Sequence, residues 1–549
     1  MAEQAINAAI RFERDAYDMG QPWLMGRQAA GHGFLRAAVA GRGDGAVIGY
    51  GASAAAPAFS AMVTAIDPRA KSGWIPHNRP EALGAARVCY RPDPLIEMEA
   101  RLRLRAGPSA YSLCGVTHTT ATSATMTALA NLFTAPLMPW DAVICTSRAV
   151  VRTIGEVQAA EADYLRWRFG PDIPLGGPQL PLIPLGVHCD DFAEAPKRRV
   201  QARRALGIGS NEIVALFVGR LAFSAKMHPA QTMMALQQAH LRTGQPLVLV
   251  LCGWSPSESI SQVIQEAARG LCPDVRLMFI DGRDPDRRDR CLAAADLFMS
   301  LSDNVQETFG LTPVEAMAAG LPVIVSDWNG YRDTVRHGID GFLTPTWMPG
   351  PGAGAEIARD YEAGILDYDN YIWRSVAATS CASAELLDQL CALVSDPELR
   401  ARMGAAGARR AREDFDWSVI YPRYQALWAE LDARRLAAPA GGAPTVSPRA
   451  QDPYRLFGHY PTRSITPETR VAAAPGATKD ELASRLALRA FGLAAVPPAL
   501  TTRVFDLALD RRRTVAELAA SAGCSAAAAS HAAGLLAKME LVILEPPAG

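Results

Sequence analysis

The chain has 549 residues, of which 49% are hydrophobic and 20% charged, so about three domains are expected. Its 55 basic and 56 acidic side chains leave a net charge of −1, which excludes a global attraction to nucleic acid or to an anionic membrane. No apolar run reaches the roughly 18 residues of a membrane span, and the N-terminus lacks a signal-peptide core. Ten cysteines without a Cys-x-x-Cys pair indicate reduced core thiols. We therefore expect a globular cytoplasmic protein with no transmembrane segment.

Apolar strands and helices alternate in the first part of the chain. Strands are expected at 46–52, 87–92, 111–118 and 142–147, a helix at 119–138, and a last strand with its exit loop at 181–192. Strands that alternate with helices favour a parallel, doubly wound sheet. The pattern predicts a Rossmann-like domain over residues 1–190.

The same alternation begins again after residue 190. Strands are expected at 212–220, 246–253, 275–282, 296–302 and 322–327, and helices at 227–244, 287–295 and 312–320. Near-continuous apolar runs such as PLVLVLCG are typical of central parallel strands. Polar helices at 400–435 are expected to close this second Rossmann-like domain, which we place at 191–435. The fold class is therefore α/β, with two doubly wound parallel-sheet domains facing a cleft.

A change of composition marks the end of the second domain. Residues 436–453 are rich in Ala, Pro and Gly, which predicts a linker, taken here as 436–477. Residues 478–549 are Ala-rich and helical, and the part at 514–545 resembles a winged-helix unit. Its would-be recognition helix holds one lysine and one histidine, a poor surface for phosphates or bases. We expect this small, mostly helical domain to serve packing, acceptor docking or homodimer formation, and no nucleic acid partner.

The most informative segment is SDNVQETFGLTPVEAMAAG (302–320). Pro313 suits the first turn of a helix, and Gly310 lets the backbone approach a ligand. The free N–H groups and the positive end of that turn can hold a phosphate or sugar oxygens. Glu315, one turn further, can accept hydrogen bonds from the vicinal hydroxyls of a ribose. Taken alone, Glu307 and Glu315 at this spacing are usually solvated surface charges.

The order strand, Glu, Gly, Pro, Glu, small-residue helix, Gly, strand resembles the donor site of glycosyltransferase family 4, which are retaining enzymes with the two-Rossmann (GT-B) fold. This resemblance implies that Glu307 faces the donor sugar and that Glu315 binds the nucleotide ribose. The segment VGRLAFSAKMHP (218–229) is similar to the Gly-Arg…Lys segment of the family. Arg220 and Lys226 would then clamp the diphosphate and stabilise the charge that develops as the glycosidic bond breaks. The family commonly has Gly after this lysine, so Met227 leaves the approach of the loop open.

Two further sites in the first domain carry the resemblance less specifically. His118 ends an apolar strand, and the carboxyl ends of such strands face the ligand crevice. The family has a histidine at a similar point, close to the donor sugar and phosphate, although a lone histidine is usually structural. Gly31 and Gly33 resemble its glycine-rich first loop, here split by His32, and a packing role is the alternative.

The predicted site has catalytic and donor-binding members. The catalytic residues are His118, Glu307, Arg220 and Lys226. The donor-binding residues are Gly31, Gly33, Arg220, Lys226, Glu307, Phe309, Gly310, Leu311 and Glu315. No Asp-x-Asp sequence lies near the expected cleft, so we expect no metal and no cofactor, and a nucleoside diphosphate sugar of the UDP or GDP type as the donor substrate.

The resemblance implies transfer of the sugar to an acceptor that the sequence does not name: a glycan, lipid, small molecule or protein. Two other classes of function stay open. One is a nucleotide-sugar epimerase on the same fold, which incubation with the donor alone would reveal. The other is a regulatory protein that uses the winged-helix-like segment.

Overall fold

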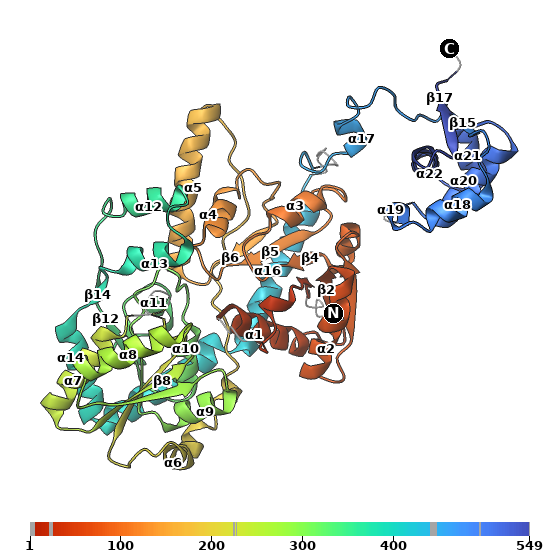
Figure 1. Ribbon diagram of the computed structural model, residues 1–549. Coiled ribbons are helices and arrows are strands. Elements are labelled where there is room, and N and C mark those ends of the chain that lie inside the picture. Colours follow the sequence, from red (N-terminus) through yellow and green to blue (C-terminus); the bar gives the residue numbers. More distant parts are fainter. Residues whose placement is uncertain are drawn as a thin grey trace. The chain divides into compact units, whose positions relative to one another are not determined.

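The computed structural model describes residues 6–20, 26–222, 226, 228–439, 447–492 and 496–547. The chain divides into two compact units, Met1–Ser447 and Pro448–Gly549, which are described separately here (Figure 1). The first unit contains two parallel sheets of six strands each, and the second contains a small antiparallel sheet. The two α/β domains expected from the sequence are thus both present in the first unit.

The first sheet has the strand order β3-β2-β1-β4-β5-β6, with every pair parallel. Its strands are β1 (Ala9–Arg11), β2 (Val47–Gly51), β3 (Ser72–Pro76), β4 (Val88–Tyr90), β5 (Ser112–Val116) and β6 (Ala142–Ile144). The central strand β1 lies upstream of the expected start of the alternation. The strand expected at 181–192 is wrong: this segment makes isolated bridges, Leu182 with Cys145 and Val187 with Asp416. Pro181 and Pro184 have no N–H to donate to a continuous ladder.

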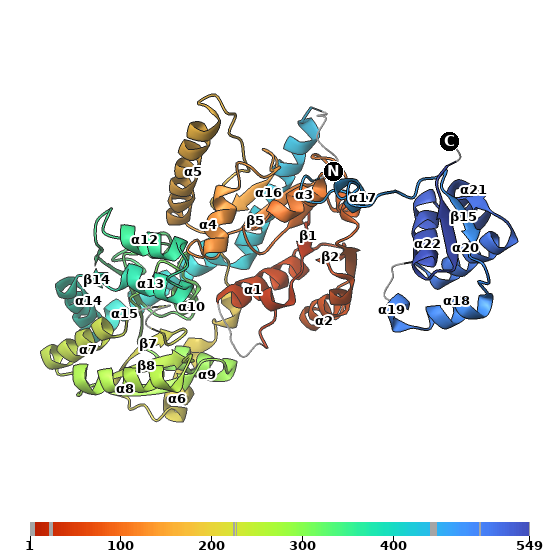
Figure 2. The ribbon, with the colours of Figure 1, turned by 45° about the horizontal axis from the view of Figure 1, so that its top comes forward.

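The second sheet repeats this topology in the order β12-β11-β10-β7-β8-β9. Its strands are β7 (Ile213–Val218), β8 (Leu247–Gly253), β9 (Arg276–Asp281), β10 (Leu297–Ser300), β11 (Val323–Ser326) and β12 (Gly341–Thr344). Alternate residues of β7 enter two different hydrophobic cores, Val214 and Leu216 on one face and Ala215 and Phe217 on the other. Helices therefore cover both faces of this sheet (Figure 2). In both sheets the strand order reverses beside the first strand, which is where open α/β sheets bind ligands.

Most helices of the first unit connect consecutive strands. In the first domain they are α1 (Gly26–Ala40), α2 (Ala56–Ile66), α3 (Glu97–Arg103), α4 (Ser123–Ala130) and α5 (Arg148–Phe169). In the second they are α6 (Ala195–Ala205), α7 (Ala230–Thr243), α8 (Glu258–Leu271), α9 (Pro285–Ala294), α10 (Leu311–Ala318), α11 (Tyr331–Thr334), α12 (Ala355–Glu362), α13 (Tyr368–Val376), α14 (Ser383–Ser395) and α15 (Pro397–Arg410). The helix expected at 119–138 is shorter than predicted, since α4 begins only after Thr122, whose hydroxyl caps it.

The last helix of the first unit, α16 (Trp417–Ala437), returns to the first domain and packs on α1, β4 and β5 (Figure 1). Its aromatic face meets Phe34, whose ring centroid lies 5.7 Å from that of Tyr424, and Tyr90, which lies 6.1 Å from Trp428. The assignment of residues up to 435 to the second domain is therefore wrong for this helix. Burial of its aromatic side chains against the first domain ties the two domains together.

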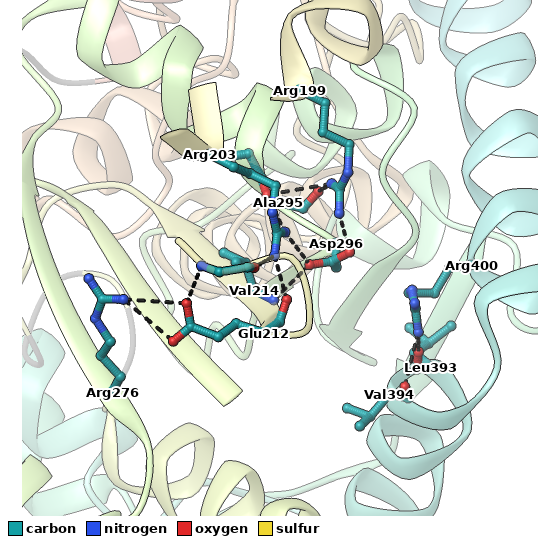
Figure 3. A network of polar contacts seen from close by, with 12 residues as sticks. Arg199, Arg203, Glu212, Val214, Arg276, Ala295, Asp296, Leu393, Val394 and Arg400 are labelled. Carbon is teal, nitrogen blue, oxygen red and sulfur yellow. Dashed lines mark hydrogen bonds and ion pairs between the residues drawn. The ribbon is translucent and has the colours of Figure 1, made fainter. Parts of the chain in front are cut away.

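A polar network braces the second domain away from the carboxyl ends of its strands (Figure 3). Asp296, just before β10, accepts hydrogen bonds from Arg199, Arg203 and the backbone N–H of Val214, at 2.5, 3.0 and 2.8 Å. Arg203 also donates to the carbonyl oxygens of Gly209 and Glu212. This network joins α6 to β7 and β10, because Arg199 and Arg203 of α6 neutralise the buried Asp296 carboxylate.

The second unit has a three-stranded antiparallel sheet in the order β16-β15-β17. Its elements are α17 (Pro453–Leu456), β15 (Arg470–Ala473), α18 (Lys479–Leu486), α19 (Arg489–Gly492), α20 (Pro498–Asp510), β16 (Arg513–Thr514), α21 (Val515–Ala522), α22 (Ala526–Lys538) and β17 (Val542–Glu545). The strand β15 lies inside the stretch 436–477 expected as a linker, so that stretch is not linker throughout. In the described part of the chain, no helix is both long and apolar enough to cross a membrane.

Candidate functional site

The site lies at the carboxyl ends of β7 and β10, the neighbouring strands at which the order of the second sheet reverses. The chain leaving β7 carries Arg220 and Lys226, and the chain leaving β10 carries Glu307. The side chains of Lys226 and Glu307, which are 81 residues apart in sequence, therefore meet. The fold thus brings together the two sequence motifs that predicted the site.

Lys226 and Glu307 form an ion pair with 3.0 Å between Nζ and Oε2. The side chain of Glu307 is 12% exposed and that of Lys226 is 36% exposed. Burial raises the pKa of the Glu307 carboxyl, but the Lys226 ammonium and the backbone N–H groups of Phe309 and Thr308 outweigh it, so the pKa is lowered. Glu307 is therefore a fixed carboxylate with its charge balanced by one lysine.

Arg220 reaches the same loop through Gln306, with 3.3 Å between Nη2 and Oε1. Burial lowers the pKa of Arg220, and the charge of Asp369 opposes that shift. A guanidinium stays protonated in proteins in spite of such a shift. The two predicted phosphate-binding cations thus contact neighbouring residues: Arg220 contacts Gln306 and Lys226 contacts Glu307.

The helix α10 begins beside this carboxylate. Its N-cap, Gly310, has φ +94°, a backbone conformation that side-chain-bearing residues rarely adopt, and an added Cβ would lie 2.2 Å from the Tyr331 ring. No side chain caps the helix, so its first N–H groups remain available to a ligand. Leu311 is the first helical residue and half-buried, whereas the Phe309 ring is buried against Phe415. Of Phe309, only the backbone is placed to face a donor.

Glu315 lies one turn further along α10 and is half-buried. Burial raises the pKa of its carboxyl, Arg288 opposes this shift, and Asp289 and Asp191 add to it. Among the residues that the structure describes, none donates a hydrogen bond to this carboxylate. Glu315 therefore has acceptor capacity left for a ligand such as a ribose.

His118 follows β5 of the first domain and meets the second domain at the site. Its carbonyl oxygen accepts a hydrogen bond from the Thr308 hydroxyl, next to Glu307. Burial lowers the pKa of the imidazole to about 4, with Arg27 acting in the same direction, and the ring donates a hydrogen bond to the Pro92 carbonyl. At neutral pH His118 is therefore an uncharged ring, able to bind a sugar hydroxyl but carrying no charge for a phosphate.

Gly31 and Gly33 do not form a loop, because both lie inside α1. An added Cβ at Gly31 would lie 2.1 Å from the Ala16 carbonyl oxygen, and one at Gly33 would lie 2.8 Å from the Trp417 indole nitrogen. The two glycines allow close packing of α1 against the preceding segment and against α16. Gly31 and Gly33 thus have the packing role that was the alternative, and the prediction of a glycine-rich loop at these residues is wrong.

The helix α13 is one element of the candidate site that the sequence motifs did not predict. Its first residue, Tyr368, lies near Arg220 and Thr119, and Trp373 stacks on His228 with ring centroids 6.1 Å apart. The signal in the sequence is the aromatic cluster YDNYIW (368–373), which lies outside the recognised motifs. In the described residues, no group of three or more His, Cys, Asp or Glu side chains is arranged to hold a metal ion.

Part of the second domain is similar to a known family. The family described as Glycosyl transferases group 1 matches residues 199–347. A D-inositol 3-phosphate glycosyltransferase of Thermobispora bispora is 30% identical over 264 residues, which are 47% of this chain and 52% of that protein. A phosphatidyl-myo-inositol mannosyltransferase of Mycobacterium leprae is 28% identical over 331 residues, 60% of this chain and 68% of that protein. The chain spans about half the length of the first of these relatives.

Among solved structures, that of Anabaena HepE in complex with UDP and glucose superimposes with a TM-score of 0.48 and 16% identity, covering 77% of this chain and 99% of HepE. The family match covers both the Arg220–Lys226 segment and the Glu307–Glu315 segment. The second α/β domain therefore resembles the Glycosyl transferases group 1 family over residues 199–347.

Proposed function

We propose that the chain is a retaining glycosyltransferase that moves a sugar from a nucleoside diphosphate of the UDP or GDP type to an acceptor, without a metal ion. The observation that carries the proposal is the convergence of Arg220, Lys226 and the uncapped N-terminus of α10 around Glu307. Two cations and free backbone N–H groups suit a leaving diphosphate. Glu315, with its acceptor capacity unused, suits the ribose of the same nucleotide.

The reaction follows from these placements. The acceptor hydroxyl attacks the anomeric carbon, a new C–O bond forms, and the bond from that carbon to the phosphate oxygen breaks. The departing diphosphate takes the proton of the hydroxyl, while Arg220 and Lys226 stabilise its growing charge. Glu307 accepts hydrogen bonds from donor sugar hydroxyls, and neutral His118 helps to hold the sugar. Orientation and electrostatics then supply most of the rate, with no protein nucleophile.

The acceptor is proposed only as a class to test first. Two relatives are named for inositol 3-phosphate and for phosphatidyl-myo-inositol. Phosphorylated or lipid-linked polyols are therefore the first acceptors to assay, followed by glycans and proteins. The chain matches 52% and 68% of the length of these two relatives, so the acceptor has to be identified by assay.

The direct test is thermal unfolding of the full chain with UDP, GDP and ADP, each alone. A ligand that binds only the folded state raises the unfolding temperature by mass action. One of the nucleotides should do so, and transfer from the matching sugar donor should continue in EDTA. No stabilisation by any of them would contradict the proposal. Epimerised donor formed in the absence of an acceptor would favour the epimerase instead.

For the C-terminal unit we propose packing or homodimer formation rather than DNA binding. The His531 side chain on α22 hydrogen-bonds to the Tyr454 hydroxyl at 3.0 Å, and Ile465 lies against Gly534 of the same helix. The face of α22 that a DNA groove would need is thus partly covered by the chain itself. Sedimentation of the full chain and of a chain ending at residue 447 would test the dimer: only the full chain should associate.

A further inference from the structure

Residues 348–379 form a helical excursion over the second domain. It leaves from β13 (Thr346–Trp347) and returns at β14 (Ser380–Cys381), and these two strands pair with each other, Thr346 opposite Cys381. The match to the glycosyltransferase family ends at residue 347, where the excursion begins. This segment, which carries α12 and α13, thus lies outside the matched residues, and one strand pair joins its two ends.

The excursion packs on three of the segments that form the site. Ile372, fully buried on α13, shares one small apolar cluster with Ala121 of the first domain and with Ala222 and Val305 of the second. These three residues follow His118, follow Arg220 and precede Glu307, respectively. The helix α13 therefore lies where the phosphate-binding, sugar-binding and first-domain segments meet (Figures 1 and 2).

Aromatic contacts fix this position. The Tyr361 hydroxyl accepts a hydrogen bond from the backbone N–H of Ser123 at 2.9 Å, which joins α12 to the first domain. The Tyr361 ring in turn stacks on that of Tyr371, with centroids 4.1 Å apart. Trp373 stacks on His228, two residues after Lys226. The excursion is thus anchored on both sides of the site, and α13 has one defined orientation.

Tyr368 is the residue of α13 that faces the phosphate-binding side. Its ring belongs to the Ile372 cluster, and its polar neighbours include the Arg220 guanidinium and the Thr119 side chain. Its hydroxyl oxygen is buried and interacts with the Thr119 side chain, but no contact of this hydroxyl with a described residue has ordinary hydrogen-bond geometry. A buried hydroxyl without a partner costs free energy, and here it lies beside a cation that is assigned to the diphosphate.

We propose that the Tyr368 hydroxyl donates a hydrogen bond to the sugar-bearing phosphate of the nucleotide donor, next to Arg220. A nucleoside monophosphate lacks this second phosphate and cannot accept the hydrogen bond. The excursion, through Tyr368 on α13, then favours binding of a nucleoside diphosphate over a monophosphate. This inference rests on the proposed function, since it assumes that a nucleoside diphosphate occupies the site.

The experiment compares the affinities of UDP and UMP, or of GDP and GMP where GDP is the preferred nucleotide, for the full chain by titration calorimetry. Tyr368→Phe should weaken diphosphate binding about 10- to 100-fold, the worth of a hydrogen bond to a charged group, and should change monophosphate binding less than about twofold. The matched control is Tyr371→Phe, one turn further along α13, whose hydroxyl is associated with Ser375 and not with Arg220. It should change neither affinity.

The outcomes separate the two proposals. Diphosphate affinity that is unchanged in Tyr368→Phe, or a loss of the same size for both nucleotides, overturns the assignment of Tyr368 and leaves the proposed function standing. A loss of the same size in Tyr371→Phe also overturns it, because the effect would then come from the packing of α13. A wild-type chain that binds no nucleoside diphosphate overturns both proposals.

Discussion

Lys226 and Glu307, which lie 81 residues apart in sequence, hold each other at 3.0 Å across the carboxyl ends of two adjacent strands. The lysine outweighs the effect of burial on the carboxylate and keeps its pKa low. The pair therefore fixes the direction of Glu307, and in the proposed function it also keeps a cation beside the leaving phosphate.

Lys226→Met should raise the pKa of Glu307, because the burial that opposes ionisation remains while the compensating charge is gone. The acid limb of the pH profile of kcat/KM should move to higher pH, and kcat/KM at neutral pH should fall about 100-fold, the order found for loss of one electrostatic stabiliser. Lys226→Arg keeps a charge and should leave the acid limb in place. If the acid limb does not move in Lys226→Met, ionisation of Glu307 does not control kcat/KM.

Glu315→Gln should weaken binding of the preferred nucleotide by about 1.5–3 kcal/mol, the worth of a hydrogen bond to a charged group. The fold should persist, because the carboxylate accepts no hydrogen bond from the described residues, and burial already raises its pKa. The matched control is Glu266→Gln, an exposed glutamate on α8 of the same domain. Equal dissociation constants for the Glu315 variant and wild type, measured by calorimetry, would remove the ribose assignment.

Long apolar runs and the motif at 302–320 carried most of the information about the fold in the sequence. The strand β8 and the helix α10 lie close to their predicted positions. The strand β1 was not predicted, because it has three residues, Ala9–Arg11, inside a charged segment, and its place at the sheet centre depends on pairing with β2 and β4. Tertiary contacts, rather than local periodicity, form such a strand.

The residues of the site that share a sequence motif could be predicted. Those whose position depends on tertiary packing could not. Glycine in a helix interior is unfavourable by about 1 kcal/mol relative to alanine, so Gly31 favoured a loop prediction. Its contact with Ala16, visible only in three dimensions, reverses that preference. The proposed role of α13 was likewise hidden, because Tyr368 lies 48 residues beyond the end of the motif at 302–320 and comes near Arg220 only through folding.

Arg203→Met should destabilise the second domain by about 3 kcal/mol, because it leaves the buried Asp296 carboxylate with one arginine fewer and removes a hydrogen bond from each of two carbonyl oxygens. The midpoint of urea unfolding is the measurement. Arg242→Met removes an exposed partner of Asp388 and should cost less than about 1 kcal/mol. Similar midpoints for the two variants would show that the network in Figure 3 contributes little.

A chain ending at residue 447 should bind nucleotide as tightly as the full chain, because residues 448–549 form a compact unit of their own. A chain ending at residue 416 is the contrasting case. It lacks α16, whose buried Trp428 and Tyr424 pack on the first domain, and should fail to fold. Loss of nucleotide binding in the chain ending at 447 would mean that the C-terminal unit takes part in the site.

The product should keep the anomeric configuration of the donor. A double displacement that retains configuration would need a carboxylate nucleophile behind the anomeric carbon. Glu307 is held by Lys226, and burial raises the pKa of Asp303 to about 7, so this carboxyl is partly protonated at neutral pH. Attack from the face of the leaving phosphate is then the route that the site supports, with the phosphate taking the proton. The anomeric proton coupling in the NMR spectrum of the product gives the configuration. An α-linked donor should yield an α-linked product, and a β-linked product would refute both same-face attack and the retaining assignment.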